Sequence, residues 1–222
     1  MINMIGIGSY DDRSVVVVNG TDRRVVARVV ARILNLDMSE KFSREIDADL
    51  PPDSTRRVLA IPEMAGLSAT YFVDLRLVSP AGHALSSNLY WLSTAPDDLD
   101  WEKSTWFTTP AKAYADFTAL NTLPAARVKT SMSSKRQGSE EEARVTVTNT
   151  GTTLAFFVRL QITKGAGGEE VLPVLWEDNY ISLLPGERRM LTATYRLRDL
   201  GASGPTLVVS GWNVAAGTVA PR

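Results

Sequence analysis

Two carboxylates and two aromatic rings stand together in residues 176–180, which read Trp-Glu-Asp-Asn-Tyr. A glycosidase needs a pair of Asp or Glu residues about 5 to 10 Å apart, so Glu177 and Asp178 are the first candidates for chemistry. Adjacent residues of an extended chain, however, point to opposite sides, which does not suit such a pair. We therefore expect no catalysis from these two carboxylates.

Two interpretations of this segment stay open. In the first, Trp176 and Tyr180 offer flat apolar faces to a sugar ring, and the segment is a substrate rim. In the second, Trp176 caps a hydrophobic core and the segment is structural. If the segment contacts sugar, the predicted contacts are Trp176, Glu177, Asp178, Asn179 and Tyr180.

The remaining residue types disfavour most other kinds of active site. His83 is the only histidine and lies in a predicted hairpin turn, so neither a serine triad nor a histidine-bound metal is expected. The chain has no cysteine, which removes thiolate chemistry and disulfides. The glycines of residues 6–8 and 165–168 lack the helix start that phosphate-binding loops need. The sequence predicts no catalytic residue, no metal site and no cofactor.

The first half of the chain has short β-branched and aromatic runs between turn signals, a spacing typical of a β-sandwich. Arg24, Arg28 and Arg32 recur every four residues, which would also suit a charged helix face. The stiff Val and Ile side chains between them, and the Asn19-Gly20 turn signal before them, favour a strand. The expected strands are residues 14–18, 24–36, 57–61, 71–78 and 85–92.

The strand of residues 71–78 alternates between two kinds of face. One face holds Tyr71, Val73, Leu75 and Leu77, and the other includes Asp74. Because successive side chains of a strand point to opposite sides, the apolar face is predicted to be the buried one.

Residues 95–126 have a different character, with Pro and Asp at the start and several large aromatic residues, among them Trp101, Trp106 and Tyr114. Long loops without structure are uncommon unless they are packed or functional. We predict a long crossing loop, a last strand within residues 114–120, and a domain boundary near residues 123–126. Trp101, Trp106 and Tyr114 are predicted to pack against another domain.

After this boundary the strand pattern starts again, and its number of strands predicts an immunoglobulin-like sandwich. Residues 184–187, with Pro-Gly at the centre, suit a type II turn. The acidic run at residues 139–142 is interpreted as a solvated strand edge. The expected strands are residues 128–132, 143–148, 155–163, 170–175, 181–184, 189–195 and 207–212.

Size and charge are consistent with two ordinary domains. The chain has 222 residues, 44% of them hydrophobic, enough for two cores of about 100 residues each. Its 24 basic and 25 acidic residues give a net charge of -1, so a nucleic-acid partner is disfavoured. No apolar run approaches the ~20 residues of a membrane span, and no membrane partner is expected.

An ordered series of motifs resembles a known family. The series resembles the fourth and fifth domains of glycoside hydrolase family 2 enzymes of the exo-β-D-glucosaminidase and β-mannosidase type. It covers nearly the whole chain after about Val15. Its motifs are SNLYWLS at 87–93, LDW at 99–101, ADFTALNTLP at 115–124, NTG at 149–151, LAFFVR at 154–159, VLPV at 171–174, WEDNY at 176–180, LPGE at 184–187 and VSGWN at 209–213.

The resemblance implies an all-β chain of two consecutive immunoglobulin-like β-sandwich domains. The first is expected at residues 1–124, with an aromatic linker at about 95–113 and a last strand, and the second at residues 125–222. It also implies a non-catalytic accessory region that packs on a TIM-barrel catalytic domain absent from this chain. The alternative is a free-standing carbohydrate-binding or protein-interaction module.

The family also implies partners and a location. The expected partners are the TIM-barrel domain of the parent enzyme and an amino-sugar or mannose oligosaccharide. The chain shows no signal peptide, and a periplasmic or secreted location is expected from the resemblance alone, with any signal upstream of Met1. The catalytic glutamate that follows an asparagine in the family has no counterpart, because the chain contains no Asn-Glu pair.

Overall fold

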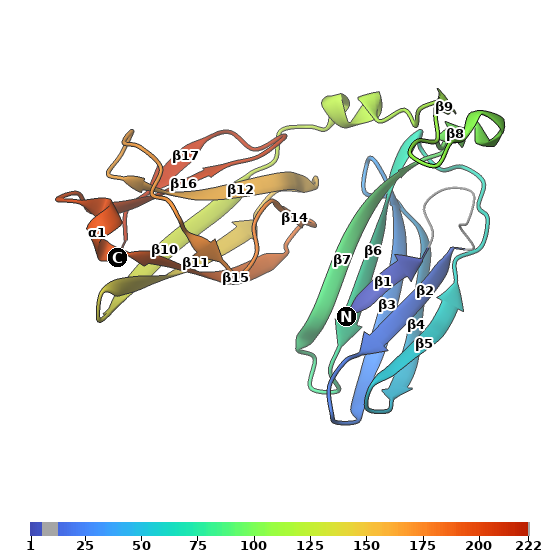
Figure 1. Ribbon diagram of the computed structural model, residues 1–222, viewed down its shortest axis with the longest axis horizontal. Coiled ribbons are helices and arrows are strands. Elements are labelled where there is room, and N and C mark those ends of the chain that lie inside the picture. The colour runs from blue at the N-terminus through green and yellow to red at the C-terminus, as the bar shows by residue number, and fades with distance from the viewer. Residues whose placement is uncertain (6–12, 222) are drawn as a thin grey trace. The chain divides into compact units, whose positions relative to one another are not determined.

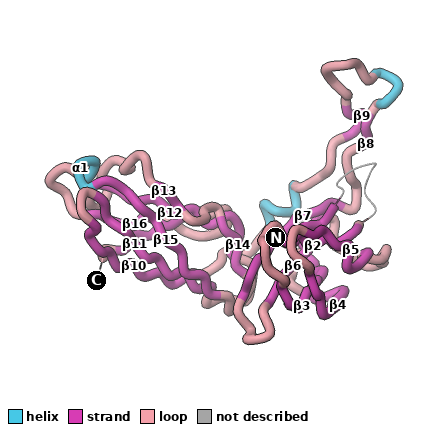
Figure 2. The backbone as a smooth tube through the Cα atoms, turned by 60° about the horizontal axis from the view of Figure 1, so that its bottom comes forward, coloured by secondary structure: helices cyan, strands magenta, loops and turns pink. Residues whose placement is uncertain are grey.

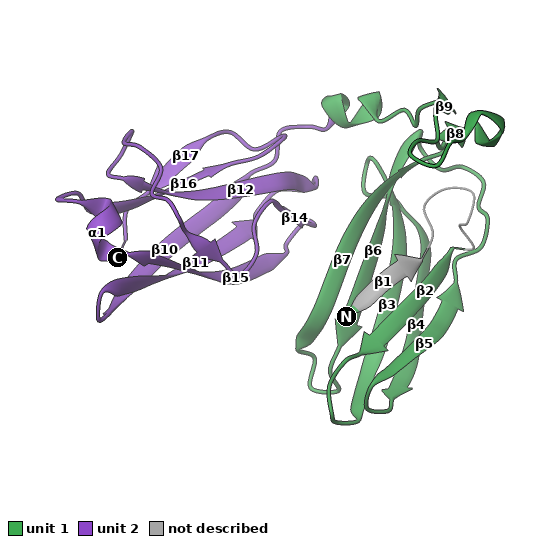
Figure 3. Ribbon diagram, viewed as in Figure 1, with its two compact units in different colours: residues 1–122 green, residues 123–222 purple. Residues whose placement is uncertain are grey.

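The computed structural model describes residues 1–5 and 13–221, so the glycines of residues 6–8 lie outside the described part. The chain divides into two compact units, Met1–Thr122 and Leu123–Arg222 (Figure 3). Each unit is a β-sandwich with its own hydrophobic core, so the predicted all-β pair of immunoglobulin-like domains is confirmed. The finer boundary between residues 124 and 125 stays a prediction.

Two antiparallel sheets form the sandwich of the first unit (Figure 1). The smaller sheet has the order β1 (Ile2–Ile5), β2 (Ser14–Asn19) and β5 (Ser54–Ala60). The larger sheet has the order β4 (Glu40–Leu50), β3 (Val25–Asn35), β6 (Thr70–Val78) and β7 (Ala84–Ser93). The core between them holds Val15, Val17, Ala27, Val29, Ala31, Ile33, Ala48, Leu50, Ile61, Val73, Leu75 and Leu77.

Arg28 and Arg32 belong to a strand, as predicted, and Arg24 directly precedes it. In β3 the apolar residues from Ala27 to Ile33 alternate into the core, while Arg28 and Arg32 lie on the opposite face. A repeat of four is twice the strand period of two, so the arginines share one face of the strand. The pattern of four therefore arises in a strand without any helix.

Strand β4 was not predicted, because it is rich in charged residues. Its acidic side chains alternate outward and pair with the arginines: Asp49 with Arg24, and Glu45 and Asp47 with Arg28, at 3.2 and 3.4 Å. On the opposite face, Ala48 and Leu50 are apolar and buried in the core. Exposed ion pairs of this kind contribute little stability, so the buried apolar half of β4 fixes its register.

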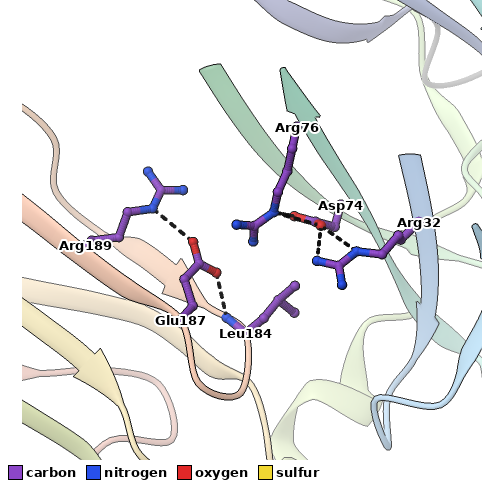
Figure 4. Close-up of polar contacts among 6 residues, drawn as sticks. All are labelled: Arg32, Asp74, Arg76, Leu184, Glu187 and Arg189. Atoms are coloured by element: carbon purple, nitrogen blue, oxygen red, sulfur yellow. Dashed lines mark hydrogen bonds and ion pairs between the residues drawn. The ribbon is translucent and has the colours of Figure 1, made fainter. Parts of the chain in front are cut away.

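Both faces of β6 are buried, which corrects the one-sided prediction. Val73, Leu75 and Leu77 enter the core as expected. On the opposite face Phe72 is 0% exposed and Asp74 is 2% exposed. The Asp74 carboxylate accepts hydrogen bonds from Arg32 Nη2 at 2.6 Å and from Arg76 Nε at 3.0 Å (Figure 4).

An arm leaves the sandwich of the first unit after β7. The arm contains β8 (Asp98–Leu99), the 3-10 helix η1 (Trp101–Lys103) and β9 (Ala111–Ala113), which pairs antiparallel with β8. Figure 2 shows this hairpin standing away from the sheets of that unit. The 3-10 helix η2 (Thr118–Thr122) follows.

The strand predicted within residues 114–120 is therefore wrong. The cause is local: the Asp116 side chain accepts hydrogen bonds from the backbone N–H and the hydroxyl of Thr118, at 2.8 and 2.7 Å. Such a side-chain bond to the residue two positions ahead gives the backbone an alternative to a sheet ladder and starts a turn.

The second unit also has two sheets. One has the order β10 (Val128–Gln137), β11 (Glu140–Asn149), β15 (Arg188–Arg196) and β13 (Leu175–Trp176). The other has the order β14 (Ile181–Leu183), β12 (Ala155–Lys164), β16 (Pro205–Ser210) and β17 (Gly217–Val219), and the short helix α1 (Leu197–Leu200) follows β15. None of the helices in the described part of the chain has the length and apolar character of a bilayer span.

The second unit corrects two predictions, the strand at residues 170–175 and the edge position of the acidic run, and agrees with the predicted turn at residues 184–187. The strand predicted at residues 170–175 is wrong, since only β13 and one isolated bridge at Glu170 form there, and Pro173 has no N–H to donate to a ladder. The acidic run is not an edge, because β11 lies between β10 and β15. The turn at residues 184–187 is as predicted, with Gly186 at φ 76° and the Glu187 N–H donating to Leu184 O at 2.9 Å.

One acidic residue of that run is buried opposite a tyrosine. Glu141 is 9% exposed and faces Tyr195, which is 2% exposed, across the β11–β15 pair. Burial raises the pKa of Tyr195 far above its usual range, and the negative charge of Glu141 adds to the rise.

This raised pKa predicts a loss of stability at alkaline pH. Because the folded chain holds the Tyr195 proton more tightly, the resulting stabilisation is complete below the unfolded pKa of about 10 and is lost above it, by about 1.4 kcal/mol per pH unit. Urea unfolding at pH 9, 10 and 11 should show a smaller decline in Tyr195→Phe than in the wild type. Tyr114→Phe, which changes an 81% exposed ring, is the control and should match the wild type. Parallel curves for wild type and Tyr195→Phe would contradict the prediction.

Candidate functional site

Trp176 begins the candidate segment and belongs to a strand. It pairs with Ala193 in the β13–β15 ladder, and its ring packs partly buried against the core of the second unit. The backbone of Trp176 is therefore fixed by the strand ladder, and its ring is fixed by packing against the core. That position fits the structural interpretation of Trp176 better than a stacking platform in solvent.

The carboxylates of Glu177 and Asp178 have different hydrogen-bond partners. The Glu177 carboxylate accepts hydrogen bonds from the backbone N–H and the hydroxyl of Thr192, both at 3.1 Å. Its own N–H donates to Thr192 O at 2.9 Å. Asp178 accepts from the backbone N–H of Asn179 at 2.8 Å and is exposed. Glu177 thus extends the β13–β15 pairing. Both carboxylates are exposed, and Asp178 makes its bond within the segment.

Asn179 fastens the segment to strand β12. Its amide oxygen accepts from Leu160 N at 2.8 Å, and its amide nitrogen donates to Leu160 O at 2.9 Å. The side chain thereby makes the two bonds that a neighbouring strand would make. The same oxygen accepts from the N–H of Tyr180 at 2.8 Å, so the backbone nitrogen of Tyr180 is held as well.

Tyr180 is the ring that this fastening presents. Its backbone is in the left-handed region at φ 53°, which is costly for a bulky residue, and its side chain is 52% exposed. The ring lies edge-on to Phe157, with centroids 6.2 Å apart. Phe157 also has a positive φ, 51°, at a β-bulge where the β12–β14 register shifts.

Two further rings continue from Phe157, giving an aromatic row that the sequence did not reveal. Phe156 lies 4.7 Å from Phe157 between ring centroids, and Trp212 lies 6.4 Å from Phe156. We call Tyr180, Phe157, Phe156 and Trp212 the aromatic row. Phe156 is 2% exposed, whereas Trp212 is 57% exposed. Two adjacent aromatics in a strand were the available signal, because regular alternation would place them on opposite faces.

Asn213 holds the Trp212 end of the row. Its amide oxygen accepts from Phe156 N at 2.9 Å, while its amide nitrogen donates to Leu154 O at 2.7 Å and Pro124 O at 2.8 Å. The preceding Gly211 is closely surrounded, since a Cβ there would lie 3.1 Å from Phe156 O. Asparagine amides therefore fasten both ends of the row.

The aromatic residues predicted to pack against another domain all lie on or beside the arm. Trp101 is 47% exposed, Trp106 94% and Tyr114 81%. Phe107, which the sequence analysis did not single out, is 89% exposed. These four rings form the most exposed aromatic group in the described part of the chain.

The structure also places His83 and the side chains that could bind a metal ion. His83 lies exposed in its hairpin turn, where its backbone closes the turn with Ser79. The described residues hold no cluster of three His, Cys, Asp or Glu side chains suited to a metal ion. What the candidate segment offers to a ligand is the exposed Tyr180 ring and the Asp178 carboxylate.

Two family models match the chain, one in each half. The exo-β-D-glucosaminidase Ig-fold domain matches residues 106–214. The mannosidase Ig/CBM-like domain matches residues 11–95. The two models together span both sandwiches.

Two relatives and one solved structure show the extent of the similarity. The exo-β-D-glucosaminidase of Streptomyces avermitilis is 41% identical over 221 residues, covering 95% of this chain and 24% of that protein. The Amycolatopsis orientalis enzyme of the same name is 40% identical, covering 95% and 21%. The crystal structure of the Amycolatopsis orientalis exo-chitosanase superposes with a TM-score of 0.91 at 37% identity, covering 99% of this chain and 26% of that one.

The chain thus spans about a quarter of the length of these relatives. Both halves match domain models named for glycosidases, and the matched region has the same fold as in the exo-chitosanase. The chain therefore belongs to the immunoglobulin-like domains of the C-terminal part of glycoside hydrolase family 2 enzymes, of the exo-β-D-glucosaminidase type.

Proposed function

We propose that this chain is the non-catalytic accessory region of an exo-β-D-glucosaminidase and that it docks on the TIM-barrel catalytic domain of that enzyme. The observation that carries the proposal is the coverage: 95% of this chain matches only 24% of the Streptomyces avermitilis enzyme. Within the candidate segment, Glu177 is engaged by Thr192, which does not suit it to act with Asp178 as a catalytic pair.

The accessory role follows from the geometry of barrel enzymes. A TIM-barrel active site opens at the C-terminal face of its strands, where rigid neighbouring domains can wall the cleft. The segment from Trp176 to Tyr180 suits such a wall, because three of its five residues are fastened to strands and Tyr180 is presented outward. Amino-sugar oligosaccharides are then the ligands that Asp178 and Tyr180 would meet.

Activity measurements test the proposal. The purified chain should release no product from a chromogenic β-D-glucosaminide. The Streptomyces avermitilis enzyme with its matching quarter replaced by this chain should be active, and the same enzyme lacking that quarter should be inactive or insoluble. Turnover by the isolated chain that disappears in Glu177→Gln would overturn the proposal.

The second candidate function is a free-standing carbohydrate-binding module, which the exposed Tyr180 and the aromatic row favour. Titration of the chain with glucosamine or mannose oligomers, followed by tryptophan fluorescence, separates the two. We expect no change at millimolar ligand under the accessory role. A saturable change that is lost in Tyr180→Ala would support the free-standing module instead.

Under the accessory role the chain works wherever its parent works, and we propose a periplasmic or secreted location. The balanced charge gives no basic surface for nucleic acid, and its proposed macromolecular partner is the catalytic domain.

A further inference from the structure

Two consecutive aromatic residues stand almost fully in solvent at the tip of the arm. Trp106 is 94% exposed and Phe107 is 89% exposed. Large aromatic side chains bury about 150 to 250 Å² each when they are covered, so this pair leaves a substantial apolar surface open. Apolar patches of this kind usually mark an interaction site.

Hydrogen bonds hold the tip in one conformation. Thr105 N donates to Thr108 O at 2.8 Å, and Thr105 Oγ1 accepts from the N–H groups of Phe107 and Thr108 at 3.3 and 3.1 Å. The hydroxyls of Ser104 and Thr109 close the turn below, 2.8 Å apart. A tip that is already ordered loses less entropy on binding, so its rings are prepared for contact.

The base of the arm is equally well fixed. Asp100 is 5% exposed, its N–H donates to Pro110 O at 2.8 Å, and its carboxylate pairs with Lys103 Nζ at 3.1 Å. Further down, Ala115 N donates to the Asp97 carboxylate at 2.8 Å. The hairpin is therefore held by hydrogen bonds along its length, and it extends away from the sandwich of its own unit (Figure 2).

The arm is also acidic. Residues 97–116 contain five acidic and two basic residues, a net charge of −3, although the whole chain is nearly neutral. One of the two basic residues, Lys103, is already paired with Asp100. A surface that receives this arm should offer an apolar pocket for the rings and positive charge around it, since complementary charge steers docking.

We infer that the tip residues Trp106 and Phe107 anchor the chain in an apolar pocket with a basic rim on the catalytic part of the parent enzyme. This inference rests on the proposed function and names the contact that it requires. The partner follows from length, because about three quarters of each matched relative lies outside this chain. The anchor is distinct from the segment of residues 176–180, which faces substrate under the same proposal.

Hydrogen exchange tests the anchor in an enzyme of full length. The probe is the Streptomyces avermitilis enzyme whose matching quarter is replaced by this chain, compared with the isolated chain. We expect the amides of residues 104–109 to exchange at least tenfold more slowly in the chimera. In the chimera carrying Trp106→Ala and Phe107→Ala, this protection should disappear, and a matched Leu175→Ala chimera, which trims a 71% exposed residue of β13, should keep it.

The outcomes separate the anchor from the proposed function. An active chimera with slowed exchange elsewhere in this chain, but none at residues 104–109, would overturn the anchor and leave the proposed function standing. A chimera in which no part of this chain is protected would remove both. Two results with the isolated chain would also overturn the anchor. One is a dimer, detected by light scattering, that the Trp106→Ala and Phe107→Ala double variant no longer forms. The other is fluorescence quenching by a glucosamine hexamer that the double variant no longer shows.

Discussion

Asn149→Asp should lower the free energy of unfolding of the second unit by about 3 to 5 kcal/mol. Asn149 is 0% exposed, and its amide nitrogen donates to Thr153 O at 2.8 Å and to Leu183 O at 2.9 Å. Aspartate has nearly the same shape but no donor, so two carbonyl oxygens would face a buried carboxylate. Each orphaned group costs about 1 to 3 kcal/mol, and burying the charge adds to that cost.

The backbone of Asn149 also bonds to the turn before β15, so the substitution should destabilise more than one strand. Asn149 N donates to Glu187 O at 2.9 Å, and Gly186 N donates to Asn149 O at 3.1 Å. Within that turn the Glu187 carboxylate accepts from Leu184 N and from Arg189 Nε, both at 3.0 Å (Figure 4). Hydrogen exchange should therefore quicken in β11, β14 and β15 together.

Urea unfolding measured by circular dichroism checks the value, and the exposed Asn121→Asp is the matched control. The control places the same charge change on the surface and should shift stability by less than about 0.5 kcal/mol. An Asn149→Asp variant as stable as this control would show that the buried amide bonds do not hold the second unit together.

Buried asparagines recur as fasteners through both units. In the first unit, Asn19 Nδ2 donates to Arg23 O, Leu50 O and Pro51 O, at 2.7, 3.2 and 2.8 Å, and is 4% exposed. The sequence marked Asn19 as a turn residue correctly, yet it gave no sign of these distant acceptors. An amide side chain carries the same donor and acceptor as a peptide group, and only the folded chain decides which backbone it joins.

The fold was predictable where local alternation and burial agree. Strands β3 and β6 have apolar residues at every second position, and both were predicted as strands. For β6 the core positions Val73, Leu75 and Leu77 were also identified in advance. Strand β4 was not predicted because Glu45, Asp47 and Asp49 pair with arginines of a neighbouring segment. Such pairing across strands is a tertiary property, and single-sequence propensity reads the same residues as loop.

The candidate site was only partly predictable for a similar reason. Tyr180 and three aromatic residues on or beside the arm, Trp101, Trp106 and Tyr114, were singled out from the sequence by their type and their surroundings. Phe157 and Trp212 joined the aromatic row through a β-bulge and the amide of Asn213, which bring residues more than 50 positions apart into one row. Bulges interrupt the period of two, so a pattern based on alternation does not locate them.

The second large effect is expected at the carboxylate clamped on the larger sheet of the first unit. Asp74→Asn should lower the free energy of unfolding of that unit by about 3 to 5 kcal/mol. Asp74 is 2% exposed, while the side chains of Arg32 and Arg76 are 30% and 24% exposed. Removing the carboxylate charge leaves two partly desolvated guanidinium groups with no counter-charge from this residue, and their mutual repulsion adds to the loss.

Two comparisons distinguish this charge effect from a general disturbance of β6. Asp47→Asn removes an exposed carboxylate that pairs with Arg28 in the same sheet, and it should cost less than about 1 kcal/mol. Arg32→Met should cost less than Asp74→Asn, because the Arg76–Asp74 pair at 3.0 Å remains. Salt should partly restore the stability of Asp74→Asn, because it screens the repulsion between the two arginines. Urea midpoints at about 0.05 and 0.5 M sodium chloride measure this effect. Equal losses in all three variants, or no salt effect on Asp74→Asn, would mean that shape rather than charge holds this face of the sheet.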